Sequence, residues 1–483
     1  MNKAGVVLGV DSSTQSTKVE ARNVQTGEVL GIGRSSHPPT EPPRSEQDPA
    51  AWWQALVDAV TQLGDVRDDV VAISIAGQQH GMVVLGADDE VLRPAKLWND
   101  TESAPEAAKL VEDFGAQNWA NACGSVPVAA FTVTKVKWLA VHEPDVFEQL
   151  SKVMLPHDYL TYRLTGNFVT DRGDVSGTGW WSPAIADYDE ELLEQIGLSP
   201  DALPKVLAPL EAAGTLSKDV ARELGLPESV VVGAGSGDNM GAALGLGLTP
   251  KDVVISLGTS GTIYGVSSSP TADATGAVAG FADATGRFLP LVCTLNATKV
   301  TEAIRNWLDV DHDELNTMAL AEPLGADGVL LLPYFDGERT PNRPNASGML
   351  SGLRPTTSRG QLARAGFEGV VHAMLDGLEA LTNAGVAASG RLLLVGGGAK
   401  SDAYRQILAD LSQREITIPY EDEVVATGAA VQAAALSSGQ SLEDVARIWE
   451  LGAGDVVSPS ADSTPEQVGE LRANYAGLRD GDQ

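Results

Sequence analysis

The sequence predicts an α/β protein of two related domains that face a shared cleft, and three observations support this fold class. The chain has 483 residues, whereas a single hydrophobic core rarely serves more than about 250–300 residues, so two domains are expected. Short β-branched runs alternate with longer helical patterns, which is typical of folds built on parallel strands. One hairpin pattern also occurs twice, once in each half of the chain.

The strands and helices follow from local patterns. Asp48 before Pro49 predicts a helix start, because the carboxylate caps free N–H groups and proline is tolerated in the first turn. The clearest helix covers about residues 361–382, where apolar residues recur every three or four positions. The predicted strands, in chain order, are Val6–Val10, Val70–Ala76, Val230–Ala234, Val253–Leu257, Val329–Leu332 and Leu392–Val395.

The repeated pattern is a strand, a tight polar turn and a second strand. It runs from Leu8 to Val19 in the first half and from Ile255 to Tyr264 in the second. Turns of Gly, Ser and Thr expose N–H groups and hydroxyls to phosphate oxygens, although any β-hairpin favours these residues. Two matched turns, the first led by Asp11, favour the phosphate interpretation. We expect an N-terminal domain at residues 1–243, a C-terminal domain at 244–455 and a polar tail at 456–483.

Composition excludes several classes of protein. The 65 acidic and 33 basic residues give a net charge of −32, a field that repels nucleic acid and anionic membranes, so neither is expected as a partner. Cys123 and Cys293 are too few for a disulfide framework, and no metal-ligand spacing occurs. The first apolar stretch is too short for a signal peptide, and no apolar run is long enough to span a membrane. These features predict a cytoplasmic protein.

The common nucleotide-binding motifs are missing from the sequence. No GxxxxGK[ST] occurs, and no GxGxxG follows the first strand. The strand Leu392–Val395 instead runs into three glycines, Gly396–Gly398, which let the backbone approach a flat or phosphorylated ligand closely. A bound nucleotide would therefore contact the hairpins and this glycine run.

Asp238 is the candidate for acid–base chemistry. It follows a strand and a run of small residues, which predicts a carboxylate at a strand end facing a crevice. Phosphoryl transfer needs positioning, Mg²⁺ and an acceptor for the proton of the attacking hydroxyl, and a carboxylate fits that last role. The alternative is that Asp238 only caps the helix that follows it.

Several motifs in a fixed order resemble the FGGY family of carbohydrate kinases, over about residues 5–450. They are the Asp11–Ser16 turn, Ser74–Gly81, Leu97–Asp100, Lys135–Trp138, Gly235–Asn239, Leu257–Gly261, Gly337–Pro341, Ser347–Glu368 and Gly396–Gly398. This resemblance implies two related actin-like ATPase (ribonuclease H-like) domains with a central cleft. It also implies an ATP-dependent sugar kinase, with Asp238 as the base that accepts the proton of the sugar hydroxyl.

The resemblance extends to the other site residues and to the substrate. It implies that Asp11 orients Mg²⁺, and that the sugar is a ketose, with D-xylulose converted to D-xylulose 5-phosphate as the leading candidate. A homodimer is also implied. The residues expected to bind or shape the site of the sugar are Gln79, His80, Trp98, Asn99, Asp100 and Asn239. Those expected around ATP are Ser13, Thr14, Gly258, Thr259, Ser260, Gly397, Gly398 and Ser401.

Four positions depart from the family pattern or stay open. Ser13 and Ser16 replace glycines that are usual in the first hairpin, and a serine in a left-handed conformation would cost about 1–2 kcal/mol. Gln79 stands where many xylulose-specific members carry methionine, and His80 could instead be a core imidazole bonded to the backbone. Alternatives are a kinase of ribulose, glycerol or another polyol, a non-catalytic sugar or nucleotide sensor, or a chaperone-like ATPase.

Overall fold

The computed structural model describes residues 5–481, which form two compact units. Unit 1 comprises residues 5–248, Ser268–Leu289 and Glu421–Leu451. Unit 2 comprises Thr249–Ser267, Pro290–Tyr420 and residues 452–481. The domain boundaries near residues 243 and 455 stay a prediction. Among residues 5–481, no helix is long and apolar enough to cross a membrane.

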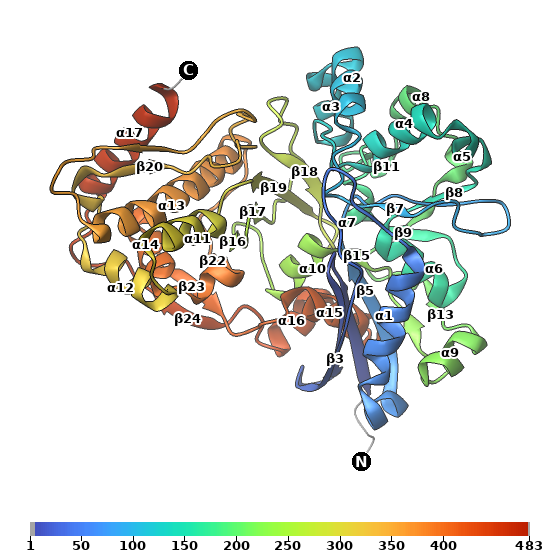
Figure 1. Ribbon diagram of the computed structural model, residues 1–483. Helices are drawn as coiled ribbons and strands as arrows, with labels where there is room; N and C mark the ends of the chain where they lie inside the picture. Colours follow the sequence, from blue (N-terminus) through green and yellow to red (C-terminus); the bar gives the residue numbers. More distant parts are fainter. Residues whose placement is uncertain (1–4, 482–483) are drawn as a thin grey trace. The chain divides into compact units, whose positions relative to one another are not determined.

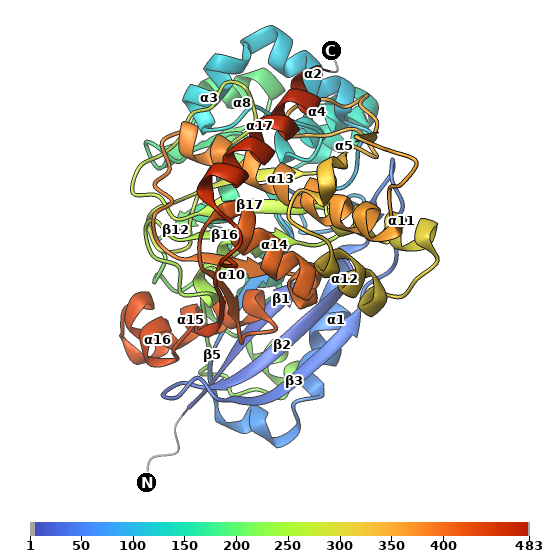
Figure 2. The same ribbon diagram turned by 90° about the vertical axis from the view of Figure 1, so that its left-hand side faces the viewer.

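The centre of unit 1 is a mixed sheet in the order β13-β14-β5-β1-β2-β3. Strands β1, β2 and β3 run side by side as an antiparallel meander, and β5 pairs with β1 in parallel (Figure 2). A short strand, β15, extends the carboxyl end of β5. The bounds are β1 Val6–Ser12, β2 Ser16–Asn23, β3 Val29–Ser36, β5 Val70–Gly77, β13 Gly214–Thr215, β14 Val231–Val232 and β15 Ser236–Gly237.

Helices cover both faces of this sheet, and β1 is therefore buried along its whole length. Leu8 and Val10 point to the face that α1 (Pro49–Thr61) and α6 (Pro156–Thr165) cover. Gly9 points to the opposite face, where α15 (Val424–Ser438) approaches so closely that a Cβ on Gly9 would lie 2.0 Å from the carbonyl oxygen of Ala426. Glycine is therefore required where α15 crosses the sheet.

The helix α10 (Asp238–Gly245) packs on α15 through small residues. A Cβ on Gly428 would lie 1.8 Å from the carbonyl oxygen of Gly241, and one on Gly245 would lie 1.9 Å from that of Val424. The two helix backbones are thus in direct contact, and α15 fixes the position of α10.

The remaining elements of unit 1 surround this core. Its other helices are α2 Ala104–Phe114, α3 Ala116–Cys123, α4 Thr132–His142, α5 Pro144–Gln149, α7 Arg172–Val175, α8 Glu190–Ile196, α9 Lys218–Leu224 and α16 Leu442–Ile448. Its short strands are β4 Glu46–Gln47, β6 Val83–Leu85, β7 Ala95–Lys96, β8 Lys152–Met154, β9 Val169–Asp171, β10 Trp181–Ser182, β11 Asp187–Tyr188, β12 Lys205–Leu207 and β18 Ala279–Ala282.

The sheet of unit 2 has the order β19-β17-β16-β22-β23-β24. Helix α13 contacts α11, α12, α14 and β17, and Figure 1 shows α11, α13 and α14 grouped together. The strands are β16 Val253–Leu257, β17 Gly261–Gly265, β19 Phe288–Thr294, β20 Leu330–Leu332, β21 Met349–Ser351, β22 Leu392–Val395, β23 Ile416–Pro419 and β24 Gly454–Val457. The helices are α11 Thr298–Leu308, α12 His312–Ala321, α13 Arg359–Asn383, α14 Asp402–Ser412 and α17 Pro465–Gly481.

The two sheets share one plan. In each, an antiparallel hairpin (β1–β2 or β16–β17) is flanked by a third antiparallel strand (β3 or β19) and by a parallel strand (β5 or β22). The predicted hairpin repeat and the α/β fold of two related halves are confirmed.

The predicted polar tail includes a packed helix. Tyr475 of α17 is fully buried and stacks on His372, with ring centroids 4.7 Å apart. Arg472 and Arg479 of the same helix bind the two carboxylate oxygens of Asp376 at 2.6 and 2.7 Å. These contacts attach α17 to α13.

Candidate active site

Asp238 is the first residue of α10, directly after the strand β15. The N-cap residue of this helix is Gly237, so Asp238 is not the N-cap. The Oδ1 atom of Asp238 accepts hydrogen bonds from the backbone N–H of Asn239 at 2.8 Å and from its Nδ2 at 3.0 Å. Burial, and then the charge of Asp11, raise the pKa of the Asp238 carboxyl to about 7. Helix capping alone therefore does not describe this residue.

Gln79 is linked to Asp238 because both accept hydrogen bonds from the side chain of Asn239. The Nδ2 of Asn239 also donates to Oε1 of Gln79 at 2.8 Å, and the Gln79 side chain is 4% exposed. A Cβ on Gly237 would lie 2.7 Å from Cγ of Gln79, so glycine makes room for this side chain. Gln79, Asn239 and Asp238 thus form one chain of polar groups.

His80 follows with backbone geometry that is rare for a residue with a side chain. Its φ is 64°, in the left-handed region, and functional sites often hold such residues. Its Nδ1 lies 2.7 Å from the carbonyl oxygen of Gly177, and its ring stacks on Phe131 with centroids 4.8 Å apart. The imidazole is therefore bonded to the backbone, which agrees with the prediction of a core histidine. It is nevertheless partly exposed, so it is also accessible to a ligand.

Trp98, Asn99 and Asp100 follow β7 and differ in their exposure. Trp98 is 44% exposed, Asn99 is half-buried, and Asp100 is fully buried. Asp100 Oδ2 accepts from the backbone N–H of Ser45 and from Nζ of Lys96, so this carboxylate is engaged within the protein. Asp100 supports the turn that carries Trp98.

An acidic cluster around Asp100 has the arrangement of a metal site but already holds a cation. One carboxylate oxygen from each of Glu46, Asp100 and Glu102 lies within 4.8 Å of the others. The Nζ of the buried Lys96 lies 3.1, 3.1 and 2.5 Å from these groups. The lysine ammonium neutralises the cluster, so we assign it a structural role.

Asp11 and Ser13 form the start of the first hairpin turn. Asp11 is 5% exposed, and the Ser13 hydroxyl donates a short hydrogen bond to its Oδ1. Burial raises the pKa of Asp11, while Ser13 and Lys18 oppose that rise. Neither Ser13 nor Ser16 has a positive φ, so the cost considered for serine at these positions does not arise.

In the second hairpin the turn residues are Gly258, Thr259 and Ser260. The carbonyl oxygen of Gly258 accepts from the backbone N–H and the hydroxyl of Thr298, at 2.9 and 2.8 Å. Thr259 and Ser260 are exposed, and within residues 5–481 their hydroxyls have no hydrogen-bond partner. This turn therefore presents free donors and is fixed to the start of α11.

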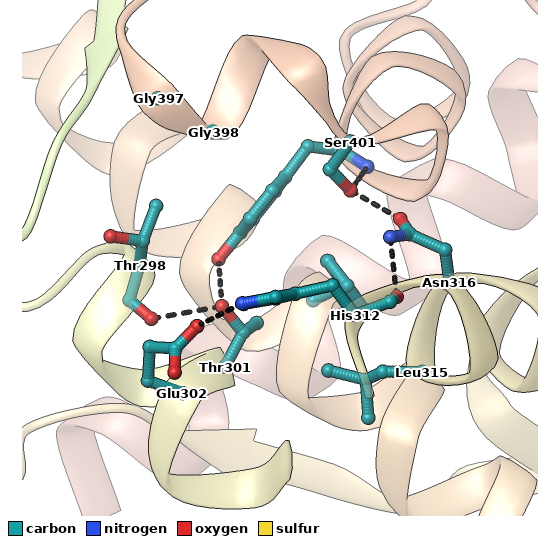
Figure 3. Close-up of a pocket in the computed structure, with 11 residues that line it drawn as sticks. Thr298, Thr301, Glu302, His312, Leu315, Asn316, Gly397, Gly398 and Ser401 are labelled. Carbon is teal, nitrogen blue, oxygen red and sulfur yellow. Dashed lines mark hydrogen bonds and ion pairs between the residues drawn. The ribbon is translucent and has the colours of Figure 1, made fainter. Parts of the chain in front are cut away.

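A cavity of about 210 Å³ lies in unit 2, between α11, α12 and the glycine run after β22 (Figure 3). It includes the predicted Gly397, Gly398 and Ser401. Gly396 has a φ of 87°, and a Cβ on Gly398 would lie 2.6 Å from Cβ of Leu257, so both positions require glycine. The lining residues are Thr298, Thr301, Glu302, His312, Leu315, Asn316, Phe367, Gly397, Gly398, Ser401 and Tyr404.

Polar contacts inside this cavity were not predicted from the sequence. Asn316 accepts a short hydrogen bond from the Ser401 hydroxyl and donates to the carbonyl oxygen of His312 at 2.7 Å. His312 Nε2 lies 3.2 Å from Glu302 Oε1. No sequence motif marks these residues, because α11, α12 and α14 bring them together from separate parts of the chain.

Comparison with known proteins identifies the family. The model of the FGGY family of carbohydrate kinases matches residues 6–245 with its N-terminal domain and 253–437 with its C-terminal domain. A xylulose kinase of Streptomyces rubiginosus is 48% identical over 94% of this chain and 92% of its own, and one of Streptomyces coelicolor is 49% identical over 94% and 92%.

A solved structure agrees with these matches. The xylulose kinase from Bifidobacterium adolescentis superposes with a TM-score of 0.86 at 39% identity, over 99% of both chains. The sequence matches, the structural match and the shared plan of the two sheets lead to one conclusion: this chain belongs to the FGGY family of carbohydrate kinases.

Proposed function

We propose that this chain transfers the γ-phosphoryl group of ATP to the terminal hydroxyl of D-xylulose, giving D-xylulose 5-phosphate. The observation that carries the proposal is the Asp238 carboxylate, bonded to Asn239, beside Gln79, and with its pKa raised to about 7. The xylulose kinases that are 48–49% identical support the choice of sugar.

Asp238 acts as the general base. A carboxylate with a pKa near the operating pH is ionised often enough to accept a proton and basic enough to take it from a hydroxyl in the transition state. Asn239 holds one carboxylate oxygen of Asp238 through two hydrogen bonds, which fixes the orientation of the group. Little covalent chemistry is needed beyond this, since phosphoryl transfer depends mainly on positioning and charge.

The sugar binds on unit 1 beside Asp238. Gln79, Asn239 and His80 supply polar contacts, and Trp98 and Asn99 form the neighbouring wall. Asp100 does not contact the sugar directly, since its Oδ2 already accepts from Ser45 and Lys96. It instead holds the turn that carries Trp98 and Asn99.

The nucleotide binds on unit 2, with its adenosine in the cavity beside Gly397, Gly398 and Ser401. The exposed hydroxyls of Thr259 and Ser260 donate hydrogen bonds to phosphate oxygens, and Gly258 lets the backbone approach them closely. Thr298 links the two regions, because it lines the cavity and also bonds the carbonyl oxygen of Gly258.

Asp11 is the proposed ligand of Mg²⁺, directly or through water. Its carboxylate offers hard oxygen ligands. In nucleotide sites Mg²⁺ is usually bound by one or two carboxylates, by phosphate oxygens and by water. The Ser13 hydroxyl orients this carboxylate through Oδ1. When bound, Mg²⁺ neutralises charge on the phosphates.

A panel of acceptors tests the proposal. ADP release from Mg·ATP is measured with D-xylulose, other ketoses, polyols and glycerol, and without any sugar. Strong stimulation by D-xylulose alone supports the proposed substrate, and preference for another acceptor rejects it while keeping the kinase. Hydrolysis without sugar would favour an ATPase. The homodimer and the cytoplasmic location stay predictions.

A further inference from the structure

Gln47 connects the turn of the first hairpin to the helix α1. It is the last residue of β4, directly before the N-cap Asp48 of α1, and it is 3% exposed. Its Nε2 donates to the carbonyl oxygen of Thr14 at 3.0 Å and to that of Pro38 at 2.6 Å. Its Oε1 accepts from the indole Nε1–H of Trp52 at 2.7 Å.

These three hydrogen bonds allow only one orientation of the Gln47 amide. An indole N–H can only donate, and a carbonyl oxygen can only accept. The amide oxygen must therefore face Trp52, and both protons of the amide nitrogen are used on the two carbonyl oxygens. Trp52 is fully buried in the core of unit 1, so the amide that holds the Thr14 carbonyl is itself fixed by that core.

The direction of the Thr14 carbonyl determines the direction of the N–H group that follows it. In a trans peptide unit the carbonyl oxygen and the next N–H point to opposite sides. Because Gln47 holds the carbonyl oxygen of Thr14, the N–H of Gln15 points away from Gln47. Gln15 is exposed, and within residues 5–481 its N–H has no acceptor. The backbone N–H of His37 holds the carbonyl oxygen of Gln15 at 2.8 Å, which fixes the next peptide unit as well.

We propose that Gln47 is a positioning residue of the phosphate site, which holds the Thr14 carbonyl so that the N–H of Gln15 faces a phosphate oxygen of ATP. Backbone N–H groups of such turns are suited to anions. Gln47 acts through the turn and does not touch the nucleotide. This inference rests on the proposed function, because it takes the ligand of the first hairpin to be the phosphates of ATP.

Two substitutions remove the N–H donors of Gln47 and keep the length of its side chain. Gln47→Glu keeps an acceptor for Trp52, and Gln47→Met is uncharged, so a loss shared by both cannot be assigned to repulsion of phosphate. We expect both to raise the dissociation constant of Mg·ATP about three- to ten-fold, since a hydrogen bond that fixes the turn is lost. The dissociation constant of adenosine, which carries no phosphate, should change less than about two-fold. Isothermal titration calorimetry measures both ligands without turnover.

Gln62 provides a matched control at the opposite end of α1, where it is the C-cap residue. Its Nε2 donates to the carbonyl oxygens of Arg34 at 2.9 Å and Asp58 at 3.1 Å, and its Oε1 accepts from the backbone N–H of Arg34. Gln62→Met therefore loses bonds of the same kind away from the turn. It should keep the dissociation constant of Mg·ATP within about two-fold of the wild-type value.

The comparison of the two ligands separates positioning from general stability. If Gln47 only stabilised the fold, its variants would lower Tm without weakening Mg·ATP more than adenosine. An unchanged dissociation constant of Mg·ATP in Gln47→Met would overturn the proposal, as would an equal loss for adenosine or an equal loss in Gln62→Met. A wild-type chain that binds Mg·ATP but phosphorylates no ketose would reject the proposed function alone, because these titrations need no acceptor. A wild-type chain that does not bind Mg·ATP would reject both.

Discussion

At the scale of single residues, Asp238 is the group on which the proposed chemistry depends. We expect Asp238→Asn to lower kcat by about 10²–10⁴-fold, the usual contribution of a general base, and to leave the dissociation constant of Mg·ATP unchanged. Steady-state kinetics and nucleotide titration measure the two effects. Asp219→Asn, at a side chain that is 92% exposed, is the control and should behave as wild type. Normal turnover in Asp238→Asn would contradict the assignment.

The pH dependence of turnover follows from the same carboxyl. Only the ionised form accepts a proton, and burial raises its pKa to about 7. The value of kcat/KM for the sugar should therefore fall as pH drops below about 7, and a profile that is flat down to pH 5 would contradict this.

The buried His157 leads to a prediction about stability. It is fully buried, with Nδ1 2.8 Å from Asp174 Oδ2 and Nε2 3.2 Å from Asp158 Oδ1. Burial disfavours the charged ring, but Asp158 and Asp174 outweigh it and raise the pKa of His157 to about 10. The folded chain thus holds a proton that the unfolded chain releases above about pH 6.5.

The protonated His157 contributes its full share of the free energy of unfolding below about pH 6.5, and this contribution is lost as pH rises to about 10. We expect the Tm of the wild-type chain to fall by at least about 4 °C between pH 7 and pH 10. His157→Gln carries no titrating ring, so its Tm should be lower at pH 7 but should fall less over the same interval. Parallel thermal melts of the two proteins measure the difference, and equal slopes would contradict the assignment.

At the scale of elements, the contact of α10 with α15 positions Asp238, the proposed base. Gly428→Ala would place a methyl 1.8 Å from the carbonyl oxygen of Gly241, so α10 must move away from α15 and take Asp238 with it. Gly469→Ala, in α17, meets nothing within 4 Å. We expect Gly428→Ala to lower Tm and kcat together, and Gly469→Ala to stabilise by about 0.5–1 kcal/mol through helix propensity. Thermal melts and kinetics of the pair check this, and a Gly428→Ala enzyme with normal Tm would contradict it.

Local patterns predicted the central elements well. The strands that became β1, β5, β16 and β22, the long helix α13 and the capped start of α1 were all predicted, because each depends on residues close together in sequence. Helix α17 was missed because its sequence is polar and its contacts are made at long range by Arg472, Arg479 and Tyr475.

The site was predictable in part, for the same reason. Motifs located Asp238, Asn239, Gln79 and His80, and the structure brings the first three together by hydrogen bonds. The sequence could not show that the Asp100 carboxylate accepts from the N–H of Ser45 or that the Thr14 hydroxyl donates to Gln78, since these partners lie 55 and 64 residues away. Asn316 and His312, in the cavity of unit 2, carry no local signal at all.

At the scale of the whole molecule, the net charge of −32 opposes compaction. Salt screens repulsion between exposed charges over about 10 Å at 0.1 M ionic strength. We expect the Tm at pH 7.5 to rise by a few degrees between 10 and 300 mM sodium chloride in differential scanning calorimetry, and to rise less at pH 5, where fewer carboxylates are ionised. A Tm that falls with added salt would show that specific ion pairs outweigh the general repulsion.

The order of the chain has a consequence for its synthesis. Unit 1 receives α15 only after the whole central part of unit 2, so the face of β1 that carries Gly9 has no cover when Leu248 leaves the ribosome. At about 5–20 residues per second, roughly 10–40 s pass before Ser438 is made. During that interval buried polar groups of this face, among them Arg22 and Ser74, lack their partners Thr427 and Gln432 of α15. A polypeptide that stops at Leu248 should therefore fold incompletely, and added residues 421–451 should restore its folding.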